Sequence, residues 1–192
     1  MCALIYLRVM MKQKNKTFIH VVAIAVAMLS ASLAKAHIVL ENQTAEVGSY
    51  YKAIFKVGHG CDNSPITKIS VIIPEGFQGA KPMAKPGWRI AVNKGKLAKP
   101  YISHGKTISE DTAEIIWDGS VLANGFYDEF VVVGKLPDQA GKLYWKVTQI
   151  CEKGLIEWKE IPVADQKIKD LQFPAAELNV IKSETVDRHH GH

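Results

Sequence analysis

The chain has 192 residues and a mass of 21.2 kDa, with 47% hydrophobic and 22% charged residues, a composition that argues against a disordered, collagen-like or coiled-coil protein and predicts one domain. The first 36 residues hold five of the 24 basic residues and no acidic one, which accounts for the formal net charge of +5. The rest of the chain therefore carries 19 basic and 19 acidic side chains, and this balance leaves no electrostatic basis for binding nucleic acid or an anionic membrane surface.

The N-terminal segment has the pattern of a secretory signal peptide. Residues 12–16 form a basic cluster, residues 18–33 form an apolar stretch interrupted by only three polar residues, and Ala34-Lys35-Ala36 supplies the small residues that signal peptidase recognises. The apolar stretch is too short and too interrupted to favour a membrane-spanning helix. We expect residues 1–36 to be cleaved, so that a periplasmic or otherwise exported mature protein begins at His37.

The mature sequence alternates between apolar and polar residues with a period of two, as half-buried strands do. Tyr51, Ala53, Phe55 and Val57, for example, fall on one face of a single strand. Glycine, proline, asparagine and aspartate turn signals separate the expected strands, which cover residues 38–40, 51–57, 69–73, 90–92, 114–117, 126–133, 143–150 and 155–161. This pattern predicts an all-β fold, an immunoglobulin-like antiparallel β-sandwich, in a single domain over residues 37–163.

After this domain the pattern fades, and residues 164–192 are expected to form a linker and a histidine-rich tail. The tail contains His189, His190 and His192. Histidine-rich tracts can bind metal, but a short cluster in a flexible tail is not a preorganised site. A metal-capturing tail and a tail without such a role remain alternatives.

Two cysteines, Cys61 and Cys151, remain after the signal peptide is removed. An isolated pair in an exported chain is usually a disulfide, and we expect one here. The alternative is that both are thiolate ligands of copper, although neither has a second cysteine at metal-site spacing.

Motif searches favour a protein that is not an enzyme. The sequence contains no G-x-S-x-G, no H-E-x-x-H, no P-loop and no dinucleotide-binding glycine pattern. Adjacent carboxylates such as Asp128 and Glu129 would point to opposite faces of a strand and could not act on one substrate.

A histidine at the start of a chain offers two nitrogen donors from one residue. The α-amine and the imidazole Nδ1 of His37 could close a six-membered chelate ring around one ion. The α-amine has a reference pKa near 8, so its deprotonation on metal binding costs little at neutral pH. Nitrogen donors in a tetragonal arrangement favour Cu(II) over calcium, magnesium or zinc.

Six separated motifs occur in the order found in a known family. They are His37-Ile38-Val39-Leu40 with Gly48-Ser49-Tyr50, Val57-Gly58-His59-Gly60-Cys61-Asp62, Ile72-Ile73-Pro74-Glu75-Gly76-Phe77, Lys85-Pro86-Gly87-Trp88, Tyr127-Asp128-Glu129-Phe130 and the run from Gln149 to Trp158. Over about residues 37–163 the chain resembles the YcnI-like domain family. The resemblance implies an exported bacterial Cu(II)-binding protein with a sandwich fold and a role in copper homeostasis, and it supports the disulfide.

Members of that family bind copper through a mono-histidine brace, in which one N-terminal histidine gives both nitrogens. Carried over, the brace is His37, the nearby tryptophan is Trp158, and the acidic ligand is Glu75, with Glu129 as the alternative. The implied partners are the copper ion and other periplasmic copper-handling proteins or a membrane copper transporter, with no nucleic acid.

Two other functions compete with copper binding. A non-catalytic adhesion or assembly module would use the sandwich only as a binding surface. A copper monooxygenase would require a second brace histidine, for which only His59 and His104 are available within the fold, and neither has a flanking pattern that recommends it.

Overall fold

The computed structural model describes residues 37–183, so the expected signal peptide and the histidines of the tail lie outside the described residues. The described part is built of strands and one short 3-10 helix, η1. The elements are β1 (Val39–Leu40), β2 (Thr44–Glu46), β3 (Tyr50–Val57), β4 (Ile66–Ile72), β5 (Gln78–Pro82), β6 (Arg89–Ser103), β7 (Lys106–Leu122), β8 (Asp128–Lys135), β9 (Gly141–Cys151), β10 (Leu155–Trp158), η1 (Ile168–Asp170) and β11 (Ala176–Ile181).

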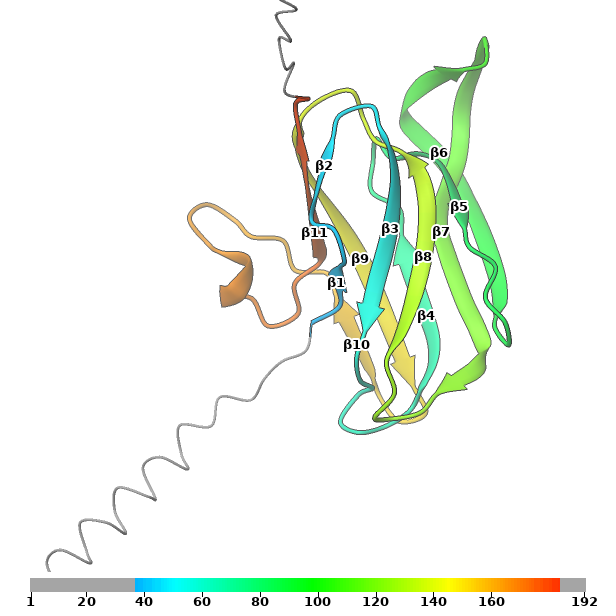
Figure 1. The fold of residues 1–192 in the computed structure, drawn as a ribbon, viewed down its shortest axis with the longest axis vertical. Helices are drawn as coiled ribbons and strands as arrows, with labels where there is room; N and C mark the ends of the chain where they lie inside the picture. Colours follow the sequence, from blue (N-terminus) through cyan, green and yellow to red (C-terminus); the bar gives the residue numbers. More distant parts are fainter. Residues whose placement is uncertain (1–36, 184–192) are drawn as a thin grey trace, which may run out of the picture. The chain divides into compact units, whose positions relative to one another are not determined.

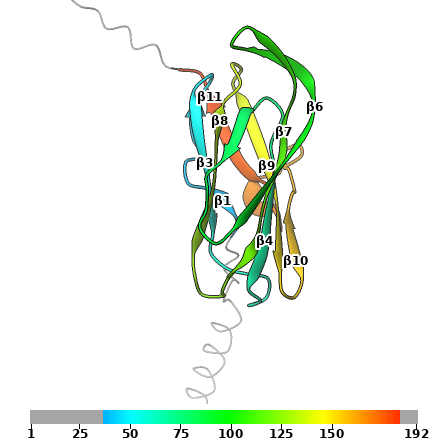
Figure 2. The same ribbon diagram turned by 90° about the vertical axis from the view of Figure 1, so that its right-hand side faces the viewer.

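Two sheets pack face to face and confirm the expected β-sandwich (Figures 1 and 2). A four-stranded sheet has the order β1-β3-β8-β5, and a seven-stranded sheet has the order β2-β11-β9-β4-β7-β6, with β10 paired to β9. All strand pairs are antiparallel except β2 with β11, which is parallel. The apolar alternation of β3 explains the layering, because Ala53, Phe55 and Val57 are buried between the sheets.

Aromatic side chains from both sheets fill the core. Trp117 and Trp145 are fully buried. Trp145 meets Phe55 edge to face with ring centroids 5.4 Å apart, and Phe130 lies between Trp117 at 5.5 Å and Trp88 at 5.1 Å. Such edge-to-face contacts add to the stabilisation that comes from area burial alone.

The domain does not end at residue 163, and the expected linker and tail over residues 164–192 is wrong for residues 176–181, which form β11. β11 pairs with β9 and β2 inside the large sheet. Its residues Ala176, Leu178 and Val180 are buried while the residues between them face outward. This is the same period-two signal that marks the other strands, but the polar stretch before it hides it.

The β6–β7 hairpin is the largest difference in strand length. The sequence predicts two short strands at residues 90–92 and 114–117, whereas β6 and β7 contain 15 and 17 residues and reach past the end of the sandwich (Figure 2). Most of β6 is exposed on both faces, so it lacks the alternation that identifies half-buried strands.

Candidate functional site

His37 lies against Trp158 at the point where the chain enters the sandwich. His37 is half-buried just before β1, and its ring is 5.6 Å from the ring of Trp158 at an interplanar angle of 67°. His37 precedes β1 of the four-stranded sheet, Trp158 ends β10 beside the seven-stranded sheet, and the two residues are 121 positions apart in the sequence. The structure therefore brings together two of the three residues expected to form the metal site.

The side chain of Trp158 is buried beside His37 and held by several contacts. It ends β10, pairs with Val147 of β9 and is only 3% exposed. Phe173 packs on it edge to face at 5.8 Å, and its indole Nε1 donates a hydrogen bond of 3.3 Å to the side-chain oxygen of Gln149. A ring held on several sides can shape the surroundings of His37 without moving.

Gln149 connects Trp158 to a third part of the site. It is 1% exposed near the end of β9, and both ends of its amide are used. Its oxygen accepts from Trp158, and its nitrogen donates a 2.8 Å hydrogen bond to the main-chain oxygen of His59. A buried amide is tolerated only when it is hydrogen-bonded in this way.

The loop after β3, residues 58–65, holds His59 against the β9–β10 hairpin. Cys61 forms the expected disulfide with Cys151, with α-carbons 6.0 Å apart. Gly60 permits the close approach, because a Cβ there would lie 1.7 Å from the main-chain oxygen of Ser64. The main-chain nitrogen of Lys153 donates to the hydroxyl of Ser64 at 2.8 Å, so several bonds fix the loop.

Replacing Gln149 by leucine is expected to destabilise the metal-free protein by about 2 to 6 kcal/mol. The substitution keeps the volume but leaves the His59 carbonyl and the Trp158 indole N–H buried without their partner, at about 1 to 3 kcal/mol each. Urea unfolding followed by tryptophan fluorescence measures the change in midpoint. The same substitution at Gln139, which is exposed, is the matched control. A loss below 0.5 kcal/mol at Gln149 would show that Gln149 does not support the site.

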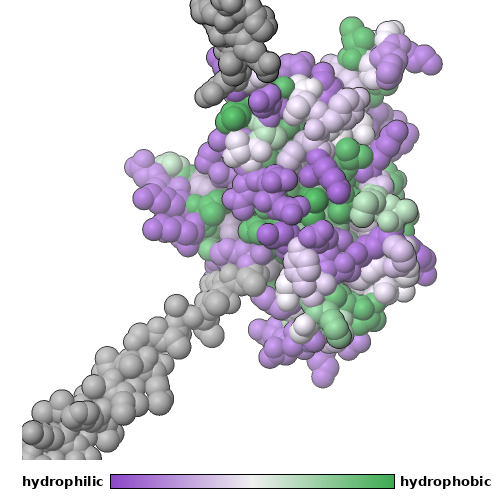
Figure 3. Space-filling view, in the orientation of Figure 1, coloured by the Kyte–Doolittle hydropathy of each residue, from purple (hydrophilic) through white to green (hydrophobic). Residues whose placement is uncertain are grey.

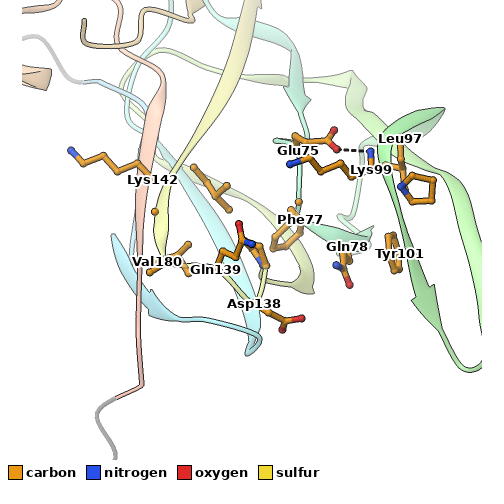
Figure 4. A pocket seen from close by; sticks show the side chains of 16 residues that line it. Glu75, Phe77, Gln78, Leu97, Lys99, Tyr101, Asp138, Gln139, Lys142 and Val180 are labelled. Atoms are coloured by element: carbon orange, nitrogen blue, oxygen red, sulfur yellow. Dashed lines mark hydrogen bonds between the residues drawn. The ribbon is translucent and has the colours of Figure 1, made fainter. Parts of the chain in front are cut away.

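Glu75 is not part of this arrangement. β1 pairs with the last residues of β3. β5, which follows the turn that holds Glu75, pairs with the end of β8. That end of β8 lies beside the first residues of β3, at the opposite end of the sheet from β1. The eight residues of β3 extend about 25 Å. Glu75 instead accepts a hydrogen bond from the main-chain nitrogen of Lys99 at 3.3 Å, in a pocket of about 450 Å³ (Figure 4). The expectation that Glu75 shares an ion with His37 is wrong, because the fold separates them.

Glu129 lies at the same end of the sheet as His37 but two strands away from β1. Val39, Lys56 and Glu129 are register partners across β1, β3 and β8, so Glu129 and Val39 are about 10 Å apart along the sheet. In the orientation of Figure 1, the visible face of the molecule carries many hydrophilic side chains with apolar ones between them (Figure 3). Desolvation, with the 2.5 Å hydrogen bond to Glu129 second, raises the pKa of Tyr127 to about 12, so its phenol remains a donor to that carboxylate at neutral pH.

His104 is not part of this arrangement. His104 is exposed in the turn of the β6–β7 hairpin. Across residues 37–183, no three or more histidine, cysteine, aspartate or glutamate side chains gather in a way that could hold a metal ion.

The same residues contain no helix of the length and apolar character needed to span a membrane.

Gln149 is the residue of this arrangement to which motif reasoning assigns no role. The sequence does carry a signal for it, because alternation along β9 places Gln149 on the same inward face as Trp145, Val147 and Cys151. An amide in such an apolar row requires buried polar partners.

Comparisons with known proteins agree with the fold. The family model described as a domain of unknown function, DUF1775, matches residues 37–180. A Bacillus subtilis (strain 168) protein named copper-binding protein CutI is 25% identical over 163 residues, which cover 82% of this chain and 69% of the relative. The crystal structure of an uncharacterized Nocardia farcinica protein, described as an immunoglobulin-like fold, superposes with a TM-score of 0.57 at 19% identity, covering 75% of this chain and 97% of that one.

Proposed function

This chain belongs to the DUF1775 family, and from that premise we propose that it is an exported protein that binds Cu(II) and stores, buffers or delivers it in copper homeostasis. The contact between the His37 and Trp158 rings carries the proposal, because it sets the first residue of the expected mature chain against a fixed aromatic wall. The relative in Bacillus subtilis that is named a copper-binding protein supports the choice of metal.

The residues present at this end of the sandwich fit a Cu(II) ion. After cleavage at Ala36, His37 would offer its α-amine and Nδ1 as a chelating pair, and these are donors that Cu(II) prefers. His37 as a whole is half-buried, and its Nε2 is buried, so the ring would offer Nδ1 as its donor. The ion would be bound at the start of the chain and not inside the core, which suits a protein that takes up and releases its cargo.

Trp158 would limit the access of water to one side of the ion. Its buried ring already lies edge to face with the His37 imidazole. An aromatic face can also attract a nearby cation. In this proposal Trp158 orients the imidazole and is not a strong ligand, since its indole N–H is committed to Gln149.

The proposed role is transport or buffering and not catalysis. The partners would be the copper ion and periplasmic copper-handling proteins or a membrane copper transporter. The balanced charge of the mature chain gives no reason to add nucleic acid.

The test is electron paramagnetic resonance of the mature protein with one equivalent of Cu(II). We expect a nitrogen-rich tetragonal spectrum that is the same for residues 37–192 and for a form ending at Ser183. The shorter form must keep β11, which belongs to the core, so truncation near residue 163 is unsuitable. A spectrum that disappears with the last nine residues would assign the copper to the histidine tail and contradict the proposal.

A further inference from the structure

The register of the β1–β3 ladder brings the main chain of His59 toward that of His37. In that ladder Val39 pairs with Lys56, so continuing the same register by two residues places Gly58 opposite His37, and His59 follows immediately. Neighbouring strands are about 4.8 Å apart. This spacing brings the main chains of His37 and His59 close together, and the contacts of Trp158 and Gln149 connect the two residues.

A chain of contacts through both sheets joins the two histidines. The His37 ring meets Trp158, the Trp158 indole donates to Gln149, and Gln149 donates to the main-chain oxygen of His59. Because Gln149 is buried and both ends of its amide are used, a shift of the His59 loop relative to Trp158 would break a buried hydrogen bond.

The His59 ring has the hydrogen bond typical of a metal-binding histidine. Its Nδ1 is 2.7 Å from the main-chain oxygen of Gly60. A carbonyl oxygen only accepts, so Nδ1 is the donor, and in the neutral ring this tautomer leaves the lone pair on Nε2. Metal-binding histidines commonly donate one ring N–H to a carbonyl in this way, which fixes the tautomer and orients the other nitrogen.

The loop that carries His59 is held in place before any metal arrives. The Cys61–Cys151 disulfide, the main-chain nitrogen of Cys61 donating to the Cys151 sulfur at 2.9 Å, and the close approach of Gly60 to Ser64 all fix its path. A ligand on a preorganised loop loses less conformational freedom when it binds.

We propose that His59 supplies a second imidazole nitrogen, through Nε2, to the Cu(II) ion bound by His37. This inference rests on the proposed function. The resulting set of one amine and two imidazoles provides three nitrogen donors without a carboxylate, which agrees with the distant position of Glu75. It contains only two metal-binding side chains, so a search for clusters of three or more does not find it.

The experiment counts imidazole ligands by pulsed electron paramagnetic resonance, in which the remote ring nitrogen of each bound imidazole modulates the echo. It uses mature protein, residues 37–192, in which His189, His190 and His192 are replaced by glutamine, so that the tail contributes no imidazole. We expect two imidazoles in this protein and one after His59→Gln, with Cu(II) affinity lower by at least about 10-fold. His104→Gln, on the exposed hairpin turn, is the matched control and should leave both values unchanged.

Each outcome separates this inference from the function on which it rests. If the protein that retains His59 shows only one bound imidazole, His59 is not a ligand, although copper is still bound at His37. This measurement does not depend on whether the His59→Gln variant folds. Two imidazoles that persist in a folded His59→Gln protein overturn it as well. Absence of any specific Cu(II) signal before His59 is changed overturns the proposed function and this inference together.

Discussion

A four-residue extension, Gly-Ser-Gly-Ser, placed before His37 is expected to weaken Cu(II) binding by at least about 100-fold, or about 2.8 kcal/mol at 1.4 kcal/mol per tenfold. The extension turns the α-amine of His37 into an amide, whose nitrogen no longer carries a basic lone pair. The chelate ring is lost and the imidazoles must hold the ion alone. Competition with a chromogenic copper chelator measures the change in dissociation constant.

The length of the extension matters for the interpretation. A free amine one or two residues before a histidine can form its own chelate through the intervening amide nitrogen, so a single added alanine could replace one strong site by another. Four residues move the amine beyond that reach. The thermal midpoint of the metal-free protein should not change, and unchanged copper affinity would show that the His37 amine is not a ligand.

The sequence predicts the layers of this fold better than it predicts the lengths of the strands. β3, β8 and β9 follow their expected ranges closely because each has one face in the core, where burial imposes alternation. β6 is an exposed edge strand stabilised by pairing with β7, and backbone pairing leaves little trace in side-chain pattern. β11 follows a polar excursion that contains η1, and its register depends on partners more than 25 residues earlier.

Some residues of the candidate site can be predicted from the sequence, and others only from the fold. His37 and Trp158 can be identified from the sequence because each stands in a motif, and the structure places their rings together. Glu75 also stands in a motif, but its turn belongs to the far end of the sheet, and strand register cannot be derived from a motif. Alternation places Gln149 on the inward face of β9, but its hydrogen-bond partners come from two other segments, and only the fold shows which they are.

Removing the disulfide by replacing Cys61 and Cys151 with alanine is expected to lower the free energy of unfolding by about 4 to 5 kcal/mol. The bridge joins positions 90 residues apart, and the entropy of closing a loop of that length in the unfolded chain gives this value. For a domain of this size the thermal midpoint should fall by roughly 10 to 15 °C. Alanine is chosen because both cysteines are buried, so serine would add the separate cost of burying a hydroxyl group.

The same substitution also tests whether the bridge organises the site. The Cys61 main-chain nitrogen donates to the Cys151 sulfur, and His59 is two residues away, so the loop loses its anchor beside the copper ligands. We therefore expect Cu(II) affinity, measured well below the lowered midpoint, to fall by about 10-fold in the double variant. Trp145→Phe, a core change far from that loop in sequence, provides a destabilised control that should keep its affinity. Equal affinity in the double variant and the wild-type protein would mean that the loop is ordered without the disulfide, and that the bridge serves stability alone.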